Sequence, residues 1–208
     1  DTYYGVQSPW KRPHMLNARD FIDYKVRAAT AAGATVPIEF SSPDSIEKIM
    51  DFVKANTGSI NGTDWWDEVT NYNAPLENYN IGITGGGKNS SLASSLGYMK
   101  QDGIIIGSNY SRITWHNSIG VDISPRIKLS SNFSLINENR QTTGEQNPWT
   151  GTVFLAQAVD PITPVFRNNL KDVPPFYNRI MDGYEANNPF SQYAGVLYTN
   201  KLNPVAQI

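Results

Sequence analysis

The 208-residue sequence contains no cysteine, so disulfide bridges, cysteine-ligated metals and cysteine nucleophiles are excluded. Charged residues are scarce, at 17%, and a formal net charge of -2 gives no general attraction for nucleic acid. No window approaches 18 consecutive apolar residues, which excludes a transmembrane helix but not membrane strands that alternate apolar and polar residues. The abundance of Tyr, Trp, Asn, Ser and Gly favours β structure with long polar loops.

The first third of the chain carries helix signals. Residues 16–33 are predicted to form a helix that Asn17 caps and Gly33 ends. Residues 42–56 have helical apolar spacing and a capping Ser42. Shorter helices are predicted at residues 65–69 and 151–159.

From Glu77 onward, apolar residues no longer follow helical spacing but recur at every second position. Four successive runs alternate apolar with small or polar residues, at 77–85, 91–100, 112–123 and 127–137. A short β-like stretch at residues 2–8 opens the chain. After Asn137 comes a proline-rich stretch of about 65 residues without a strand pattern, and a loop of that length is usually functional.

The stretch "IGITGGGKNSS" has the glycine spacing of a phosphate-binding loop, Gly82 and then Gly87-Lys88. Such a loop needs Ser or Thr after the lysine and a helix behind it, whereas Asn89 and a strand pattern follow here. We therefore predict a tight hairpin turn in which the glycines supply positive φ and Lys88 and Asn89 face solvent.

Periodicity alone leaves two architectures open. In a soluble β-sandwich the apolar face of each strand points to a core, and in a membrane β-barrel it points to lipid while the polar face lines the lumen. Short turns that alternate with long loops are typical of the barrel, but sandwiches are the commoner class. A soluble or cell-surface sandwich that binds glycans is therefore the alternative to a barrel.

Three segments carry a family resemblance. They are "YYGVQSPWKRPHMLNARDFIDYKVRAA", "NGTDWWDEVTNYNAPLENYNIGITGGGKNSSLASSLGYMKQDGIIIGSNYSRITW" and "NPVAQI". Together they resemble SusC/RagA-like TonB-dependent outer-membrane transporters of Bacteroidetes, with the middle segment the most specific. The resemblance implies an all-β fold with helical loop insertions, part of an antiparallel up-and-down transmembrane barrel of about five to six strands that this chain alone does not close.

The resemblance also implies an organisation. The chain, residues 1–208, would be an N-terminal part of the barrel, with a helical extracellular insertion at 9–76 and a long Pro-rich extracellular loop at 138–203. Because family members are several times longer and five or six strands cannot close a barrel, we expect a fragment of a larger transporter.

By the same resemblance, the whole transporter would import oligosaccharides or peptides across the outer membrane for nutrient uptake. The implied partners are the rest of its chain (plug and remaining barrel), a SusD-like lipoprotein, TonB through a missing N-terminal part, and outer-membrane lipid. No enzyme activity, cofactor, metal or nucleic acid is expected.

Two sets of site residues follow. Loop aromatics could stack on substrate or on a capping partner, or could simply pack the loops together: Trp65, Trp66, Tyr72, Trp149, Phe166, Tyr177 and Tyr184. Polar residues of the alternating runs would line the lumen: Asn78, Asn80, Thr84, His116, Asp122 and Asn132.

Catalytic chemistry has weak support in the sequence. His14 and His116 lie in no metal-binding spacing. The carboxylates Asp64, Asp67 and Glu68, beside two tryptophans, could serve a hydrolase, but carboxylates at a helix start are usually caps. We therefore predict capping roles for this group.

Overall fold

The computed structural model describes residues 1–143, 151–166 and 205. The chain divides into two compact units. Unit 1 comprises residues 1–10 and 71–142, and unit 2 comprises residues 11–70 together with the chain from 143 onward. No helix in the described part combines the length and apolar character needed to cross a bilayer.

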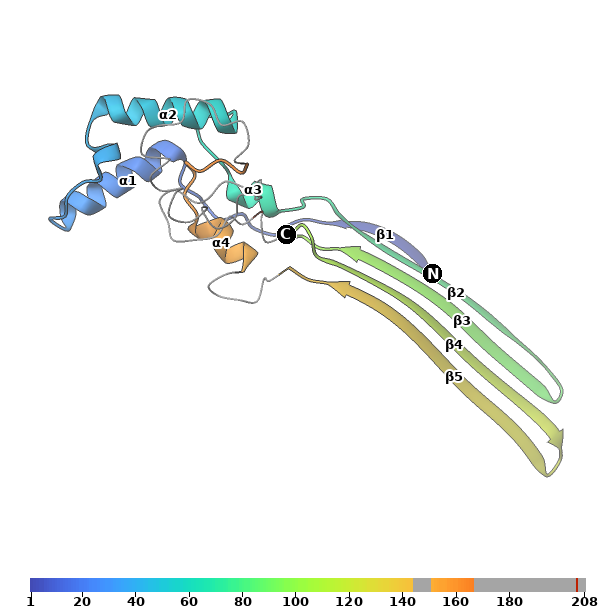
Figure 1. Ribbon diagram of the computed structural model, residues 1–208. Helices are drawn as coiled ribbons and strands as arrows, with labels where there is room; N and C mark the ends of the chain where they lie inside the picture. Colours follow the sequence, from blue (N-terminus) through green and yellow to red (C-terminus); the bar gives the residue numbers. More distant parts are fainter. Residues whose placement is uncertain (144–150, 167–204, 206–208) are drawn as a thin grey trace. The chain divides into compact units, whose positions relative to one another are not determined.

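Unit 1 is one antiparallel sheet whose five strands lie in sequence order (Figure 1). The strands are β1 (Thr2–Gln7), β2 (Ala74–Gly87), β3 (Ser90–Asp102), β4 (Asn109–Ser124) and β5 (Ile127–Gln141). This meander follows directly from the period-two runs. Within the described residues no second sheet covers it, so the β-sandwich alternative is wrong for this part of the chain.

Two-residue turns join β2 to β3 and β4 to β5, because Gly87 pairs with Ser90 and Ser124 pairs with Ile127. The predicted hairpin at Lys88 and Asn89 is confirmed, but the predicted role of its glycines is wrong. Gly85 to Gly87 belong to β2, and among the glycines that the structure describes, positive φ occurs at Gly33, Gly58, Gly62 and Gly107. Gly86 is needed for close approach, since a Cβ there would lie 2.7 Å from the carbonyl oxygen of Ser90.

The strands extend a few residues beyond the predicted runs. β2 begins at Ala74 and β5 ends at Gln141, so each enters a segment that we expected to be loop. The extracellular position of the segments 9–76 and 138–203 stays a prediction. A sixth strand beginning at "NPVAQI" lies, apart from Val205, outside the described residues.

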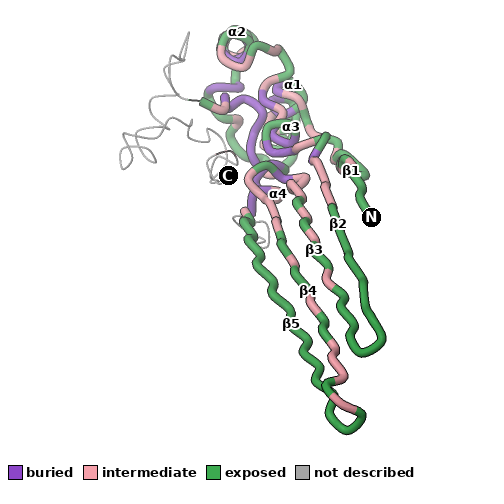
Figure 2. The backbone as a smooth tube through the Cα atoms, turned by 90° about the vertical axis from the view of Figure 1, so that its right-hand side faces the viewer, coloured by how far each residue is buried: buried purple, intermediate pink, exposed green. Residues whose placement is uncertain are grey.

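Unit 2 is helical: α1 (Ala18–Ala31), η1 (Ile38–Phe40), α2 (Pro43–Thr57), α3 (Trp65–Val69) and α4 (Thr152–Ala158). The predicted caps form, because Asn17 accepts the amide N–H of Asp20 and Ser42 accepts that of Ser45. The buried residues of this unit lie mainly in its helices and in the non-helical run 159–164 (Figure 2). One core cluster joins α1 and α2 to Ile162, and another joins α3 to α4.

Candidate functional site: the two faces of the sheet

The strand register sorts apolar and polar side chains onto opposite faces of the sheet. Across β2 to β5, one row of partners is Ile81, Leu96, Trp115 and Leu135, and the adjacent row is Gly82, Ser95, His116 and Ser134. Successive side chains on a strand point to opposite faces, so these two rows lie on different sides. The same alternation repeats along the strands and gives an apolar face and a polar face.

The apolar face is exposed. Ile81 is 68% exposed, Trp115 is 42% exposed and Phe133 is 45% exposed, although each is large and hydrophobic. The strands of the sheet are almost entirely exposed or intermediate along their length (Figure 2). An exposed apolar surface that covers four strands is much larger than a monomeric soluble protein usually tolerates, and it marks a contact with lipid or protein.

Aromatic side chains lie at one border of this face and within it. Tyr79 and Tyr98 are cross-strand partners whose rings stack with centroids 6.2 Å apart. Trp115 meets Phe133 edge to face at 5.2 Å. Beyond the tyrosine pair the next row is polar, with Glu77 opposite Lys100, so the tyrosines mark one border of the apolar face. Tyrosine at such a border is typical of a membrane interface.

The polar face carries all six residues predicted to line a lumen. Asn78, Asn80, Thr84, His116, Asp122 and Asn132 fall on it by register. Their role as lumen-lining residues stays a prediction, but the structure brings them to one surface. At its hairpin end Asp122 pairs with Lys128 on the next strand, Oδ2 to Nζ, at 3.5 Å.

Two hollows lie on the polar face. A hollow of about 400 Å³ is bordered by Thr84, His116 and Asn132, and one of about 200 Å³ is bordered by Asn80, Arg112 and again His116. Small residues leave this space, since Ser95 borders both hollows and Gly97 lies under the side chain of Asn80. Amides, hydroxyls and an imidazole offer donors and acceptors to a polar solute or to a polar segment of polypeptide.

The loop aromatics divide between the core and the surface. Trp65 is 2% exposed, its Nε1 donates to the carbonyl oxygen of Asp160 at 2.8 Å, and it packs with Val69 and Ala156. Trp66 is also buried. Tyr72 and Phe166 are exposed. Trp65 and Trp66 are therefore buried within unit 2, whereas Trp149, Tyr177 and Tyr184 lie outside the described residues.

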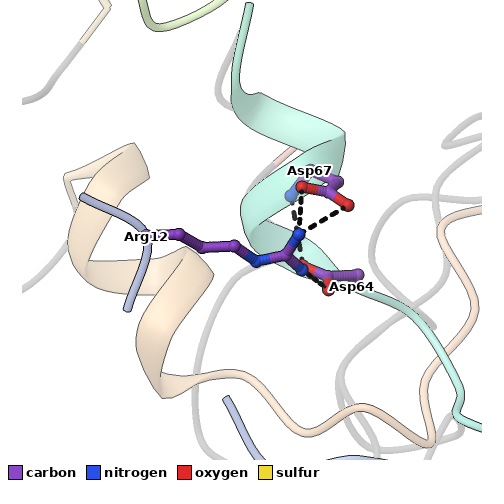
Figure 3. Close-up of polar contacts among 3 residues, drawn as sticks. All are labelled: Arg12, Asp64 and Asp67. Carbon is purple, nitrogen blue, oxygen red and sulfur yellow. Dashed lines mark hydrogen bonds and ion pairs between the residues drawn. The ribbon is translucent and has the colours of Figure 1, made fainter. Parts of the chain in front are cut away.

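The carboxylates beside these tryptophans have structural contacts (Figure 3). Asp64 caps α3 by accepting the amide N–H of Asp67, and Arg12 forms an ion pair with each of the two carboxylates. The pKa of Glu68 is raised mainly because burial desolvates its carboxylate, and to a smaller extent by the negative charges of Asp67 and Asp64. In the described residues no three His, Asp or Glu side chains lie together in an arrangement that could hold a metal ion.

Sequence reasoning missed two parts of this arrangement. The first is the ion pair of Arg12 with Asp64, because two residues 52 positions apart leave no local signal in the sequence. The second is a hollow in unit 2, of about 660 Å³. It is bordered by Asp67, Glu68 and Phe166, which come from α3 and from a segment about 100 residues later.

No protein-family model matches the chain. Among curated proteins, it is 25% identical to TonB-dependent receptor P26 of Formosa agariphila, over 70% of this chain and 13% of that receptor. It is 37% identical to TonB-dependent receptor P3 of the same organism, over 34% of this chain and 7% of that receptor. It is 32% identical to TonB-dependent receptor SusC of Bacteroides thetaiotaomicron, over 57% of this chain and 11% of that receptor.

Two solved structures share the fold. The RagAB peptide transporter matches with a TM-score of 0.59 at 17% identity, over 82% of this chain and 21% of that one. The RagAB peptide importer in its open-open state matches with a TM-score of 0.61 at 16% identity, over 99% of this chain and 23% of that one. This chain therefore spans a small part of each relative, and its open sheet matches part of a transporter β-barrel. The resemblance drawn from the sequence is confirmed as a resemblance: this chain is similar to one segment of TonB-dependent receptors, SusC among them, and its fold matches part of the RagAB transporter.

Proposed function

We propose that this chain forms part of the barrel wall of an outer-membrane, TonB-dependent importer of oligosaccharides or peptides. The observation that carries the proposal is the sheet with an exposed apolar face and a polar face on the same strands. A wall between lipid and an aqueous lumen needs this pattern, because backbone hydrogen bonds are made between strands and side chains alternate between the two media.

The height of the apolar face supports a membrane-spanning role. From Tyr79 to Gly87 the strand rises about 27 Å along its own axis. At the tilt of about 40° common in barrels, that corresponds to about 21 Å along the membrane normal, close to the apolar band of about 25 Å in outer-membrane barrels. The polar row at Glu77 and Lys100 would then lie at the membrane surface.

The proposed partners are a SusD-like lipoprotein at the extracellular side, TonB, and the remainder of the transporter chain. Similarity to SusC and to the RagAB transporter supports this assembly. In it, the segments 9–76 and 138–203 would be extracellular, and their exposed Tyr72 and Phe166 could contact substrate or the lipoprotein. Trp149, Tyr177 and Tyr184 are proposed for the same role.

Both substrate classes have support. Peptides are supported by the similarity to a peptide transporter, and oligosaccharides by the hydroxyl and amide groups on the polar face. The test is uptake by cells that produce the intact transporter, with fluorescent oligosaccharides and fluorescent peptides as probes. We expect uptake of one class, and we expect it to stop when TonB is removed. Unchanged uptake of both classes after removal of the transporter would contradict the proposal.

A further inference from the structure

The sheet has a middle band without charge. Between its ends, the four long strands carry no Asp, Glu, Lys or Arg at residues 79–87, 90–99, 113–121 and 129–137. The absence holds on both faces, including the polar one. Charges therefore gather at the two ends of the strands, where a membrane-spanning wall would leave the apolar interior of the bilayer.

The two ends differ in the sign of their charge. Around the hairpin turns, residues 84–92 and 120–130 contain Lys88, Arg126 and Lys128 but only one carboxylate, that of Asp122. Lys128 pairs with it at 3.5 Å and is still 75% exposed at its side chain. For Lys88 and Arg126, no ion pair is found within the described part of the chain. The opposite end mixes acids and bases, including Glu77, Lys100, Asp102, Arg112, Glu138 and Arg140.

The two hairpin turns are held side by side. The backbone N–H of Asp122 donates to the carbonyl oxygen of Asn89 at 2.8 Å, which ties the β2–β3 turn to the end of β4. The amide N–H of Arg126 donates to Ser124 Oγ at 3.3 Å and fixes the second turn. The cations of both turns are thereby presented along one edge of the wall.

Apolar side chains adjoin these cations. Ile123 is 62% exposed and Ile127 is 55% exposed, next to the second turn. Long basic side chains beside exposed apolar residues suit the boundary between acyl chains and headgroups, since their stems stay in the apolar layer while their charges reach the surface. A surface of that chemistry attracts anionic lipid.

We propose that the hairpin end of this sheet binds the phosphate groups of anionic glycerophospholipids through the turn residues Lys88 and Arg126. The inference rests on the proposed function, which places the apolar face in lipid. It adds a lipid preference at one membrane surface, where the cations of two adjacent turns meet the headgroups.

The test uses the intact transporter in phosphatidylcholine vesicles with spin-labelled phosphatidylglycerol or spin-labelled phosphatidylcholine as the probe. The fraction of motionally restricted label gives the relative association of each lipid with the protein perimeter. We expect an approximately fivefold preference for phosphatidylglycerol, the factor that one cation near an anionic surface supplies. Raising salt to about 1 M should remove it, because the screening length falls to about 3 Å.

The decisive variant is Lys88→Gln with Arg126→Gln, and its matched control is Lys100→Gln with Arg140→Gln at the other end of the sheet. The first should bring the preference close to one, and the second should keep it. Both substitute exposed side chains, and heat-modifiable mobility on a gel checks that each barrel is assembled.

Other outcomes separate this inference from the function on which it rests. If neither labelled lipid is restricted, the apolar face does not meet lipid and the proposed function fails. If both are restricted equally, or if the control pair rather than the hairpin pair abolishes the preference, only the lipid-binding inference is overturned. Competition by inorganic phosphate at matched ionic strength would also overturn it, since the site would then recognise the free ion.

Discussion

Trp115 on β4 donates its indole N–H to Ser94 Oγ on β3 at 3.1 Å. Their strand partners are Leu96 and Asn117, so the bond runs diagonally across the apolar face. The indole has one donor, and a buried or lipid-exposed N–H without an acceptor is costly. Ser94 therefore allows a tryptophan to lie within the apolar face, where it packs edge to face with Phe133.

We predict that Ser94→Ala destabilises the intact transporter by about 1–2 kcal/mol, because the indole N–H loses its acceptor. Urea unfolding of the transporter in lipid vesicles measures the change. In a Trp115→Phe background the donor is absent, so the same substitution should cost little, and the cycle should give a coupling of at least about 0.5 kcal/mol. A coupling near zero would mean that the bond contributes nothing.

Among the described glycines, Gly62 leaves the least room for a side chain. It has a φ of +84°, and a Cβ would lie 2.1 Å from the carbonyl oxygen of Pro161. The next residue, Thr63, donates its amide N–H to that same oxygen at 2.9 Å and its hydroxyl to the carbonyl oxygen of Thr163 at 2.6 Å. Two segments separated by about 100 residues are held together here.

Gly62→Ala should therefore cost more than about 2 kcal/mol, the strain of a left-handed alanine plus the clash with Pro161. Gly33→Ala is the matched control, since Gly33 also has a positive φ, +63°, but nothing within 4 Å of its Cβ position. Hydrogen exchange at the Thr63 amide is the readout. Equal loss of protection in the two variants would show that conformation, and not close approach, sets the cost.

Local signals predicted most elements well. The caps at Asn17 and Ser42, the short helix at 65–69 and the strand periodicity each depend on neighbours in sequence, and the structure confirms them. The two faces of the sheet could also be predicted, because the alternation along each strand determines which of its side chains lie on the same face. The separation of apolar from polar residues therefore follows from the alternation alone.

Contacts between distant segments could not be predicted. Ile162 completes the core of α1 and α2, and Asp160 accepts the indole N–H of Trp65, although both lie in the segment after the sheet. No periodicity in residues 159–165 indicates these contacts. The prediction that the glycines before Lys88 have positive φ was wrong for a related reason. Glycine is also found where two backbones approach closely, as at Gly86.

The acidic group in unit 2 gives a pH prediction. The pKa of Glu68 is raised by desolvation and by Asp67 and Asp64, so the folded state holds its proton more tightly than the unfolded state. Stability should then fall as pH rises from about 4.5 through the raised pKa. Glu68→Gln should increase the melting temperature of the transporter at pH 7 and leave it nearly unchanged at pH 4.

Asp44→Asn is the control for that experiment. Asp44 lies in the first turn of α2 and is exposed, with Lys48 as its ion-pair partner at 2.7 Å. Its removal should slightly lower stability at pH 7, the opposite sign, because an exposed pair is worth less than about 1 kcal/mol. If Asp44→Asn also raised the melting temperature, the effect of Glu68→Gln would come from the change in net charge and not from the local environment of Glu68.

Adjacent residues on β2 provide the sharpest test of the two faces. Ile83 lies on the apolar face and Thr84 on the polar face, at nearly the same height on the strand. Arginine on the lipid side of a barrel costs about 2–4 kcal/mol near the bilayer midplane, whereas a polar lumen accepts it. Ile83→Arg should therefore reduce the amount of assembled, heat-modifiable transporter in the outer membrane, and Thr84→Arg should leave assembly intact while changing uptake. Equal assembly of both variants would mean that lipid does not contact the apolar face, and the barrel-wall function would fail with it.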